Sequence, residues 1–569
     1  MRNGYALSLS LLLVVIASGI ANSQSFRVQC PTSTITHPST LTNVNAEPAY
    51  SGPTTLAINS NGFYAPTANV NGAIKCQQVS GGDGYSTMAD GTQTFMFSFG
   101  PLSGLADIAN GQAGTEFPNV FNTVYPGTLK PGDPAMSDGA TSGASPGSPS
   151  LFTFNGAAGL MPDLDAIASG ACTAPCLDGH VDPRQIMDVG VMNGNIPAPL
   201  VAFDEDDEMF LTLTNVGMLM RPDLFEQHTI HFHGYPNASS FYDGVPDASV
   251  AINIGGSFTY YYLAPDAGTY FWHCHITPPE HLQMGMVGQL YVRPRQDRVP
   301  QGTSLYTALQ QQNGLGTTVD LRTACNPNND ILCSAFTPAI NTGLNQGLDL
   351  LGNPQRYVYN DGDGSTAYDV EYPIQMHDFD PNFHFVGMTF NPEAFVDMRG
   401  KYFLLNGRSY PDTVATGPQA TMSSDGRMHY SQPLPALINI PAGGKASLRL
   451  VNLSVEQYHT LATLGIPMKE VGFNAKLLRD QEGNNTEFYT NSITLGGGES
   501  LDVILDASDA GCGSAGCAVK LYPAGSVFYL YTPNLDHLSN DAENFGGMMT
   551  EVHICNSVTG GSTYGNTCN

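Results

Sequence analysis

Apolar and polar residues alternate in short runs along much of the chain. The clearest runs lie at 92–99, 209–215 and 257–263, and the last reads Ser-Phe-Thr-Tyr-Tyr-Tyr-Leu. Successive side chains of a strand point to opposite faces, so each run predicts a strand with one face toward a core. Residues 24–90 are rich in Ser, Thr, Asn, Gly and Pro and have no helical periodicity. The pattern predicts an all-β protein.

The predicted strands fall into two groups separated by turn-rich segments. Further short apolar runs at 186–192, 200–203 and 288–294 complete the first group, and 436–452 is a strand, a glycine turn and a strand in the second group. A Gly- and Pro-rich insertion at about 100–183 interrupts the first group. We expect an N-terminal extension at 24–90, a first domain at 91–295, a connector at 296–370, a second domain at 371–556 and a tail at 557–569.

The first 23 residues have the features of a secretory signal peptide. Arg2 is basic, residues 6–20 are apolar, and Ala21-Asn-Ser23 offers small residues for cleavage. The apolar run is short for a membrane span, and no later stretch is long enough for one. The sequence predicts a secreted or periplasmic protein without a membrane span.

Charge excludes one class of partner. The chain has 21 Lys and Arg against 50 Asp and Glu, a net charge of −29. Nucleic acid binding requires basic patches that neutralise phosphates, so we expect no nucleic acid partner. An acidic surface attracts cations over a distance, which favours a cationic substrate only through steering.

Residues with metal-binding side chains gather in two segments. Cys274 is flanked by His273 and His275, with His281 seven residues and Met286 twelve residues after the cysteine. The upstream segment is Gln-His-Thr-Ile-His-Phe-His-Gly at 227–234. Cysteine, two histidines and a weak axial methionine are the ligands of an electron-transferring copper site. These two segments therefore predict copper.

The alternation of side chains along a strand divides these ligands into two sites. Cys274 points to one face of its strand while its two neighbouring histidines point to the other. The first site then contains His228, Cys274, His281 and Met286, and the second contains His231, His233, His273 and His275. Cys274 thus forms a short covalent connection for electrons between a first copper and a second metal position.

The order of these residues resembles the copper signature of the multicopper oxidases. Asn-Gly-Asn-Ile-Pro-Ala-Pro at 193–199, Asp-Gly-Val-Pro at 243–246 and Gly-Thr-Tyr at 268–270 extend the resemblance. It implies two cupredoxin-like Greek-key β-sandwiches, a type 1 copper at the first site and part of a trinuclear, oxygen-reducing cluster at the second. The interval from Cys274 to His281 departs from the usual pattern, being two residues longer through Pro278-Pro279.

An internal comparison limits the function. In the expected second repeat, His459 and His537 take the places of His228 and His281. The other ligand positions fall on Ala462 and Leu464 in one segment and on Tyr529, Leu530 and Tyr531 in the other. The resemblance implies eight histidines for a trinuclear cluster, four from each of two domains, and only the first domain has four.

Three functions are compatible with this pattern. The first is a secreted copper-dependent oxidoreductase of multicopper oxidase type, with cluster histidines facing a neighbouring subunit of a homo-oligomer. The second resembles copper nitrite reductase, with one type 2 copper. The third is a non-catalytic electron-transfer or structural copper protein. We favour the first, with Cys274, His273 and His275 carrying electrons to the second centre.

The resemblance also implies the reaction partners. Electrons enter near His281 from a small molecule, a metal ion or a protein, and oxygen is the acceptor.

Cysteine content fits an oxidising compartment. The chain has eleven cysteines, and assigning Cys274 to copper leaves an even number. Proximity in sequence favours five disulfides, and the sequence alone does not establish their connectivity. The favoured pairs are 30–76, 172–176, 325–333, 512–517 and 555–568.

Overall fold

The computed structural model describes five main parts of the chain. These are residues 34–101, 160–181, 194–304, 347–509 and 520–569, with gaps at 39–48, 51–54, 63, 69, 163–176, 219–220, 222–223, 225, 235–238, 255, 265, 389–394, 423–427, 481–482, 542 and 562–564. The predicted signal peptide, most of the insertion and the predicted strand at 186–192 lie outside the described residues. In the described part, no helix has the length and apolar character needed to cross a membrane.

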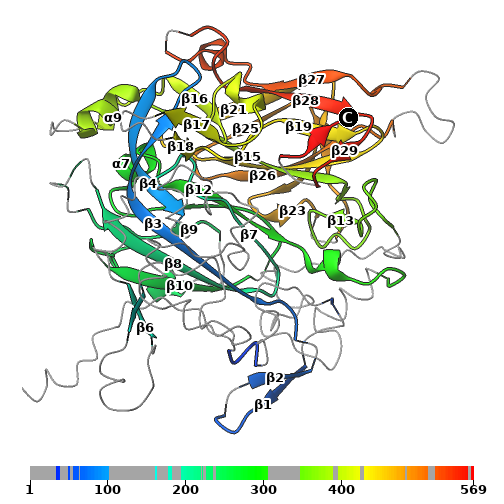
Figure 1. Cartoon of the computed structure of the whole chain (residues 1–569). Helices are drawn as coiled ribbons and strands as arrows, with labels where there is room; N and C mark the ends of the chain where they lie inside the picture. Colours follow the sequence, from blue (N-terminus) through cyan, green and yellow to red (C-terminus); the bar gives the residue numbers. More distant parts are fainter. Residues whose placement is uncertain are drawn as a thin grey trace, which may run out of the picture.

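Two four-stranded sheets pack face to face to form a first β-sandwich (Figure 1). One sheet has the order β10-β8-β3-β4, with bounds Ser257–Leu263, Glu208–Gly217, Ile74–Thr87 and Gln93–Pro101. The other has the order β7-β12-β11-β9, with bounds Val201–Asp204, Val287–Arg293, Gly268–His273 and His231–Phe232. Their inner faces bury a core that contains Trp272 and Cys274.

Strand β3 is central in the first sandwich although it lies before residue 91, in the predicted extension. This strand pairs in parallel with β8 and antiparallel with β4, so the first sandwich begins at Ile74 within the predicted extension. Its glycines gave no alternating signal, yet they allow close packing. A Cβ on Gly84 would lie 2.3 Å from the Gly194 carbonyl oxygen. Close backbone approach, rather than an apolar pattern, explains this strand.

A second β-sandwich follows, with the order β16-β15-β20-β26-β22-β23 in one sheet, where β24 pairs with β22, and β19-β28-β27-β21-β25 in the other. The first sheet contains Tyr402–Leu405, Val370–Phe379, Lys445–Asn452, Ser500–Asp506, Met468–Phe473, Lys476–Leu477 and Phe488–Thr490. The second contains Ile438–Pro441, Met549–Cys555, Val527–Tyr531, His459–Leu464 and Ser492–Leu495. The strand, glycine turn and strand predicted at 436–452 are β19 and β20.

Short hairpins and helices complete the described structure. The hairpins are β1–β2 (Thr55–Ile58, Tyr64–Ala68), β5–β6 (Leu160–Pro162, Leu177–Val181), β13–β14 (Arg356–Tyr357, Ala367–Tyr368), β17–β18 (Gln419–Met422, Met428–Ser431) and β29–β30 (Val558–Thr559, Thr567–Cys568). The α-helices are α7 (Pro278–Gln283) and α9 (Pro381–Met388). The all-β expectation is therefore confirmed, and α7 occupies the Pro278-Pro279 segment that was expected to be a loop.

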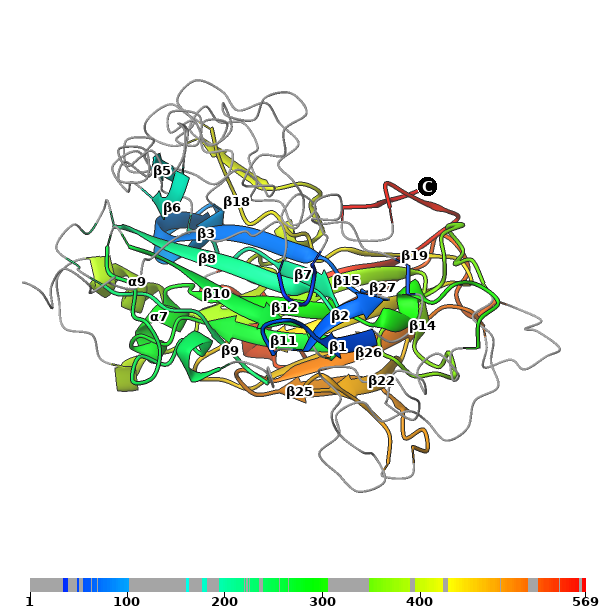
Figure 2. The same ribbon diagram turned by 90° about the horizontal axis from the view of Figure 1, so that it is seen from below.

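The two sandwiches pack against each other along one sheet of each. Strand β11 of the first lies against β20 and β26 of the second. Strands β11 and β26 are labelled in Figure 2, which views the molecule from below. Glu371 on β15 is fully buried and forms ion pairs with Arg293 on β12 (2.9 Å) and Arg449 on β20 (2.7 Å). The burial of Glu371 would raise its pKa, but the nearby arginines outweigh burial and hold the pKa well below its usual range.

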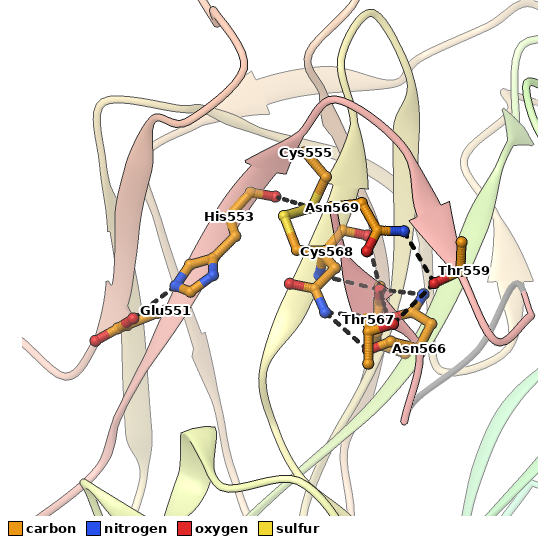
Figure 3. The surroundings of a disulfide bond; sticks show 10 residues. Glu551, His553, Cys555, Thr559, Asn566, Thr567, Cys568 and Asn569 are labelled. Atoms are coloured by element: carbon orange, nitrogen blue, oxygen red, sulfur yellow. Dashed lines mark hydrogen bonds and ion pairs between the residues drawn. A yellow bond between two sulfur atoms is a disulfide. The ribbon is translucent and has the colours of Figure 1, made fainter.

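One predicted disulfide is confirmed. Cys555 and Cys568 are bonded and fasten the C-terminal β29–β30 hairpin to β28 (Figure 3). Asn566 in this segment is buried and hydrogen-bonded to Tyr372 at 2.8 Å, so the tail is part of the second sandwich. The other four predicted pairs involve side chains outside the described part of the chain.

Candidate metal centres

The first candidate centre is closed by backbone hydrogen bonds at the end of β11. The Cys274 N–H donates to the Met286 carbonyl at 3.1 Å, and the Met286 N–H donates to the His281 carbonyl at 2.8 Å. Helix α7 takes up the intervening chain and turns His281 inward, where it is fully buried. Three residues separated along the sequence therefore meet at one end of the sandwich.

The ligand atoms of this centre face one another in a dry environment. Nitrogen atoms of His228 and His281 and the Cys274 Sγ lie within 4.8 Å of one another, and all three residues are buried. The Cys274 Sγ is 3.2 Å from His281 Nδ1 and accepts the Thr229 N–H at 3.4 Å. Met286 is fully buried in the same core cluster as Cys274. The structure thus brings His228, Cys274 and His281 together and buries Met286 in the same core.

The protonation of the two histidines fits a cation between them. Both ring nitrogens of His228 are buried without a hydrogen-bond partner, and burial holds the pKa of this histidine well below its usual value. Burial would also lower the pKa of His281, but Cys274 and the Glu226 carboxylate outweigh it and raise the pKa to about 10. His228 is neutral and available as a ligand, and a metal ion bound beside Cys274 would displace the proton of His281. The donor set, a buried sulfur with two imidazoles and a thioether, fits copper.

A second group of histidines lies on the other side of Cys274. Ring nitrogens of His231, His233 and His273 lie within 4.8 Å of one another, and Nε2 of His233 is 3.0 Å from Nε2 of His273. The His275 ring is 5.0 Å from the His231 ring, measured between centroids. The four histidines of the predicted second site are therefore neighbours.

Backbone carbonyls fix the orientation of two of these rings. Nδ1 of His231 is 2.7 Å from the Asp243 carbonyl oxygen, and Nδ1 of His273 is 2.7 Å from the Cys274 carbonyl oxygen. A carbonyl only accepts, so each Nδ1 carries the proton and each Nε2 keeps its lone pair. Burial lowers the pKa of His233 to about 4 and the pKa of His273 well below its usual value. The imidazoles of His233 and His273 are therefore neutral at pH 7, as metal ligands must be.

The second sandwich closes over this cluster. A cavity of about 250 Å³ beside His233 is lined also by Phe271, Asn474 and Gly498. A Cβ on Gly498 would lie 2.9 Å from Nδ1 of His233, and its φ of +83° also favours glycine. The glycine turn before β26 therefore allows the second sandwich to approach the histidines closely.

Residues outside the predicted set support the first centre. Gly81 on β3 faces His228, and a Cβ at this position would lie 2.7 Å from the ring. Glu226 Oε2 lies 3.6 Å from Nε2 of His281, and Thr229 donates to the cysteine sulfur. No sequence signal marked Gly81, because its strand was not predicted, whereas Glu226 and Thr229 are the close neighbours of a predicted ligand.

The structure corrects the predicted alignment of the repeats around Cys274. In the first sandwich His231 pairs with His273, and in the second Ala462 pairs with Tyr531. The next residue after Tyr531 is Thr532, so Thr532 and not Leu530 corresponds to Cys274. The interval to the following histidine also differs, being five residues from Thr532 and seven from Cys274.

A buried sulfur and two imidazoles at one end of a two-sheet sandwich define a cupredoxin-type copper domain. The family model for multicopper oxidase matches residues 178–297, which contain both candidate centres. Residues 178–297 are therefore similar to a multicopper oxidase domain, and this similarity covers less than half of the chain.

Several known proteins are similar to parts of this chain. Multicopper oxidase MCE of Talaromyces pinophilus is 33% identical over 112 residues, which cover 19% of this chain and 17% of that protein. Laccase-1 of Emericella nidulans is 35% identical over 121 residues, covering 20% and 17%. The chain thus matches less than a fifth of the length of these relatives. Among solved structures, blue copper oxidase of Nitrosomonas europaea is 16% identical, with a TM-score of 0.42 over 84% of this chain and 86% of that one.

Proposed function

We propose that the chain is a secreted copper-dependent oxidoreductase of multicopper oxidase type. His228, Cys274, His281 and Met286 would hold a type 1 copper. The observation that carries this proposal is the pair of buried, unpartnered nitrogens on His228 beside the Cys274 sulfur. An unpaired buried polar atom costs free energy, and a metal ion would give these nitrogens a partner.

Bound copper would supply reversible one-electron transfer. The surrounding residues determine the environment in which this electron transfer would take place. The Thr229 N–H donates to the sulfur, and the surrounding apolar core excludes water. Glu226, 28% exposed at its side chain, lies against His281 at the edge of the site. This edge is where we propose that a small-molecule, metal-ion or protein electron donor docks.

His231, His233, His273 and His275 would hold the second copper centre, where oxygen would be the electron acceptor. Cys274 is covalently adjacent to His273 and His275, and the Cys274 carbonyl also accepts the His273 Nδ1–H. The path from the sulfur to this second group therefore runs through a few bonds of one strand. This short connection supports Cys274, His273 and His275 as the electron-transfer residues.

One observation favours a second candidate, an electron carrier without turnover. At the second-centre positions, the described part of the second sandwich has Ala462, Leu464 and Tyr531 in place of imidazoles. A complete cluster would need histidines from a neighbouring subunit, and a nitrite-reductase-like enzyme would need only one further copper.

Copper content, visible absorption and paramagnetic resonance of the copper-loaded protein test the proposal. We expect an intense blue band and a second copper signal, with consumption of oxygen in the presence of a donor. Cys274→Ser should abolish the band and turnover, and His231→Gln should remove only the second signal and turnover. His553→Gln, a histidine paired with Glu551 outside both centres, is the control and should change neither.

The outcomes distinguish the candidates. A single blue copper with no turnover would refute the oxidase proposal and favour the electron carrier. Turnover that survives Cys274→Ser would refute the bridging role of the cysteine.

A further inference from the structure

The second sandwich repeats the backbone arrangement of the first metal centre. The Thr532 N–H donates to the Met548 carbonyl at 3.0 Å, and the Met548 N–H donates to the His537 carbonyl at 2.9 Å. The first centre is closed by the same two bonds, whose donors there are Cys274 and Met286. A histidine, a threonine in place of the cysteine and a methionine are therefore held in the same arrangement.

The two histidines of this second arrangement match those of the first. The centroids of the His459 and His537 rings are 5.2 Å apart at an interplanar angle of 67°. The corresponding values for His228 and His281 are 5.3 Å and 63°. His459 and Met548 are fully buried, and His537 is 7% exposed. The pair geometry has been retained although the cysteine has not.

Ring nitrogens of both histidines lack a partner. Nδ1 of His459 and Nδ1 of His537 are buried without a hydrogen bond. Nε2 of His459 is 2.6 Å from the Ser454 Oγ and 3.5 Å from the Asp378 carboxylate. With the proton on Nε2, toward Ser454 and Asp378, Nδ1 keeps its lone pair for a metal ion. A carboxylate behind a histidine is the usual support of a metal-binding imidazole.

A cavity at the surface gives access to His537. His537 lines a cavity of about 460 Å³ whose wall also includes Asp536, Asp541, Lys401 and Gln457. The net charge of −29 favours the approach of cations to the molecule.

We propose that His459, His537 and Met548 form a binding site for a monovalent copper ion in the second sandwich. Two imidazoles and a thioether are a soft donor set that suits Cu(I). Because Thr532 replaces the cysteine, this copper would have no thiolate ligand and would add no blue absorption. The site is separate from both centres of the proposed function.

Sulfur scattering in X-ray absorption can isolate the new site. The background is full-length Cys274→Ser/Met286→Leu, which removes both sulfur donors of the first centre. We would load this protein with Cu(I) as the only metal, in competition with a chromogenic Cu(I) chelator. It should still show copper–sulfur scattering. Adding Met548→Leu should abolish that scattering and weaken Cu(I) retention at this site by at least tenfold.

The matched control is Met468→Leu, the same substitution at a fully buried methionine of the same core. It should leave scattering and retention unchanged. Absence of sulfur scattering in the background protein, or equal loss in both methionine variants, would overturn the proposal. Because the proposed function is read from the blue band of wild-type protein, either claim can fail while the other stands.

Discussion

Replacing Gly81 by alanine should disturb the first copper centre, although Gly81 lies on β3 and this strand has no metal ligand. The new Cβ would lie 2.7 Å from Cδ2 of His228, whereas ordinary contact begins at 3.4 Å, so the ring must move by about 0.7 Å. Binding sites require their ligands within about 0.5 Å of the productive position. We therefore expect copper affinity to fall by about 10–100-fold, as for the loss of other supporting contacts.

Gly82→Ala is the matched control because the next residue points to the other face of the same strand. Its Cβ would meet Val216 Cγ2 at 2.6 Å and no ligand. Overpacking should lower the free energy of unfolding by about 1–3 kcal/mol in both variants. Only Gly81→Ala should also shift the visible band and the paramagnetic resonance spectrum.

The assay is a copper titration followed by visible absorption, with thermal unfolding of the metal-free protein measured in parallel. Equal copper affinity and identical spectra for the two alanine variants would refute the contact between β3 and His228. Loss of affinity in both variants, in proportion to their loss of stability, would show that general destabilisation is the cause.

Two further predictions concern stability. Glu371→Gln should lower the free energy of unfolding by about 3–5 kcal/mol, since Arg293 and Arg449 lose their buried counter-charge, and calorimetry at pH 7 checks this. Because the folded-state pKa of Glu371 is depressed, its contribution is present above the ordinary glutamate pKa and is lost as the pH falls, so wild type and variant should converge in acid. A Cys555→Ser/Cys568→Ser variant should lose about 3 kcal/mol, the loop-closure value for bonded cysteines 13 residues apart, and an unchanged denaturant midpoint would contradict this.

Residue type and strand parity were sufficient to predict the candidate site. Cys274 and His273 lie at consecutive positions of one extended segment, so their side chains must face opposite ways. The structure has this arrangement, with the cysteine sulfur beside His281 and the His273 ring beside His233. Such local geometry is independent of the rest of the fold, which is why the sequence predicts it.

Strand β3 could not be predicted because contacts with distant parts of the sequence, and not its own residue pattern, determine it. The sequence Val-Ser-Gly-Gly-Asp-Gly has no apolar alternation, and its glycines are required by neighbours distant in sequence. Gly84 lies against Gly194, and Gly81 lies against His228. These glycines are required by segments distant in sequence, so the local sequence pattern cannot reveal the strand until those contacts are known.

The register error in the second repeat has a similar cause. The sequence comparison placed Leu530 near Cys274, but hydrogen-bond ladders set the register of a strand, and intervening loops can change length. The ladder places Thr532 there, with five residues to His537 in place of seven. Spacing is reliable inside a strand, as in the His-Cys-His triplet, and unreliable across a loop.

The close approach of the second sandwich also bears on the choice between oxidase and carrier. Among described residues, the wall of the cavity beside His233 includes Asn474, Gly498 and Ser500 and no histidine of the second sandwich. Position 498 has no room for an opposing imidazole, because even a Cβ there would crowd His233. Further ligands for the second centre would then come from outside this turn, for example from solvent or from a neighbouring subunit. The copper count per chain therefore tests the reaction and the assembly together, since a multinuclear cluster on this surface requires donors that the facing turn does not supply.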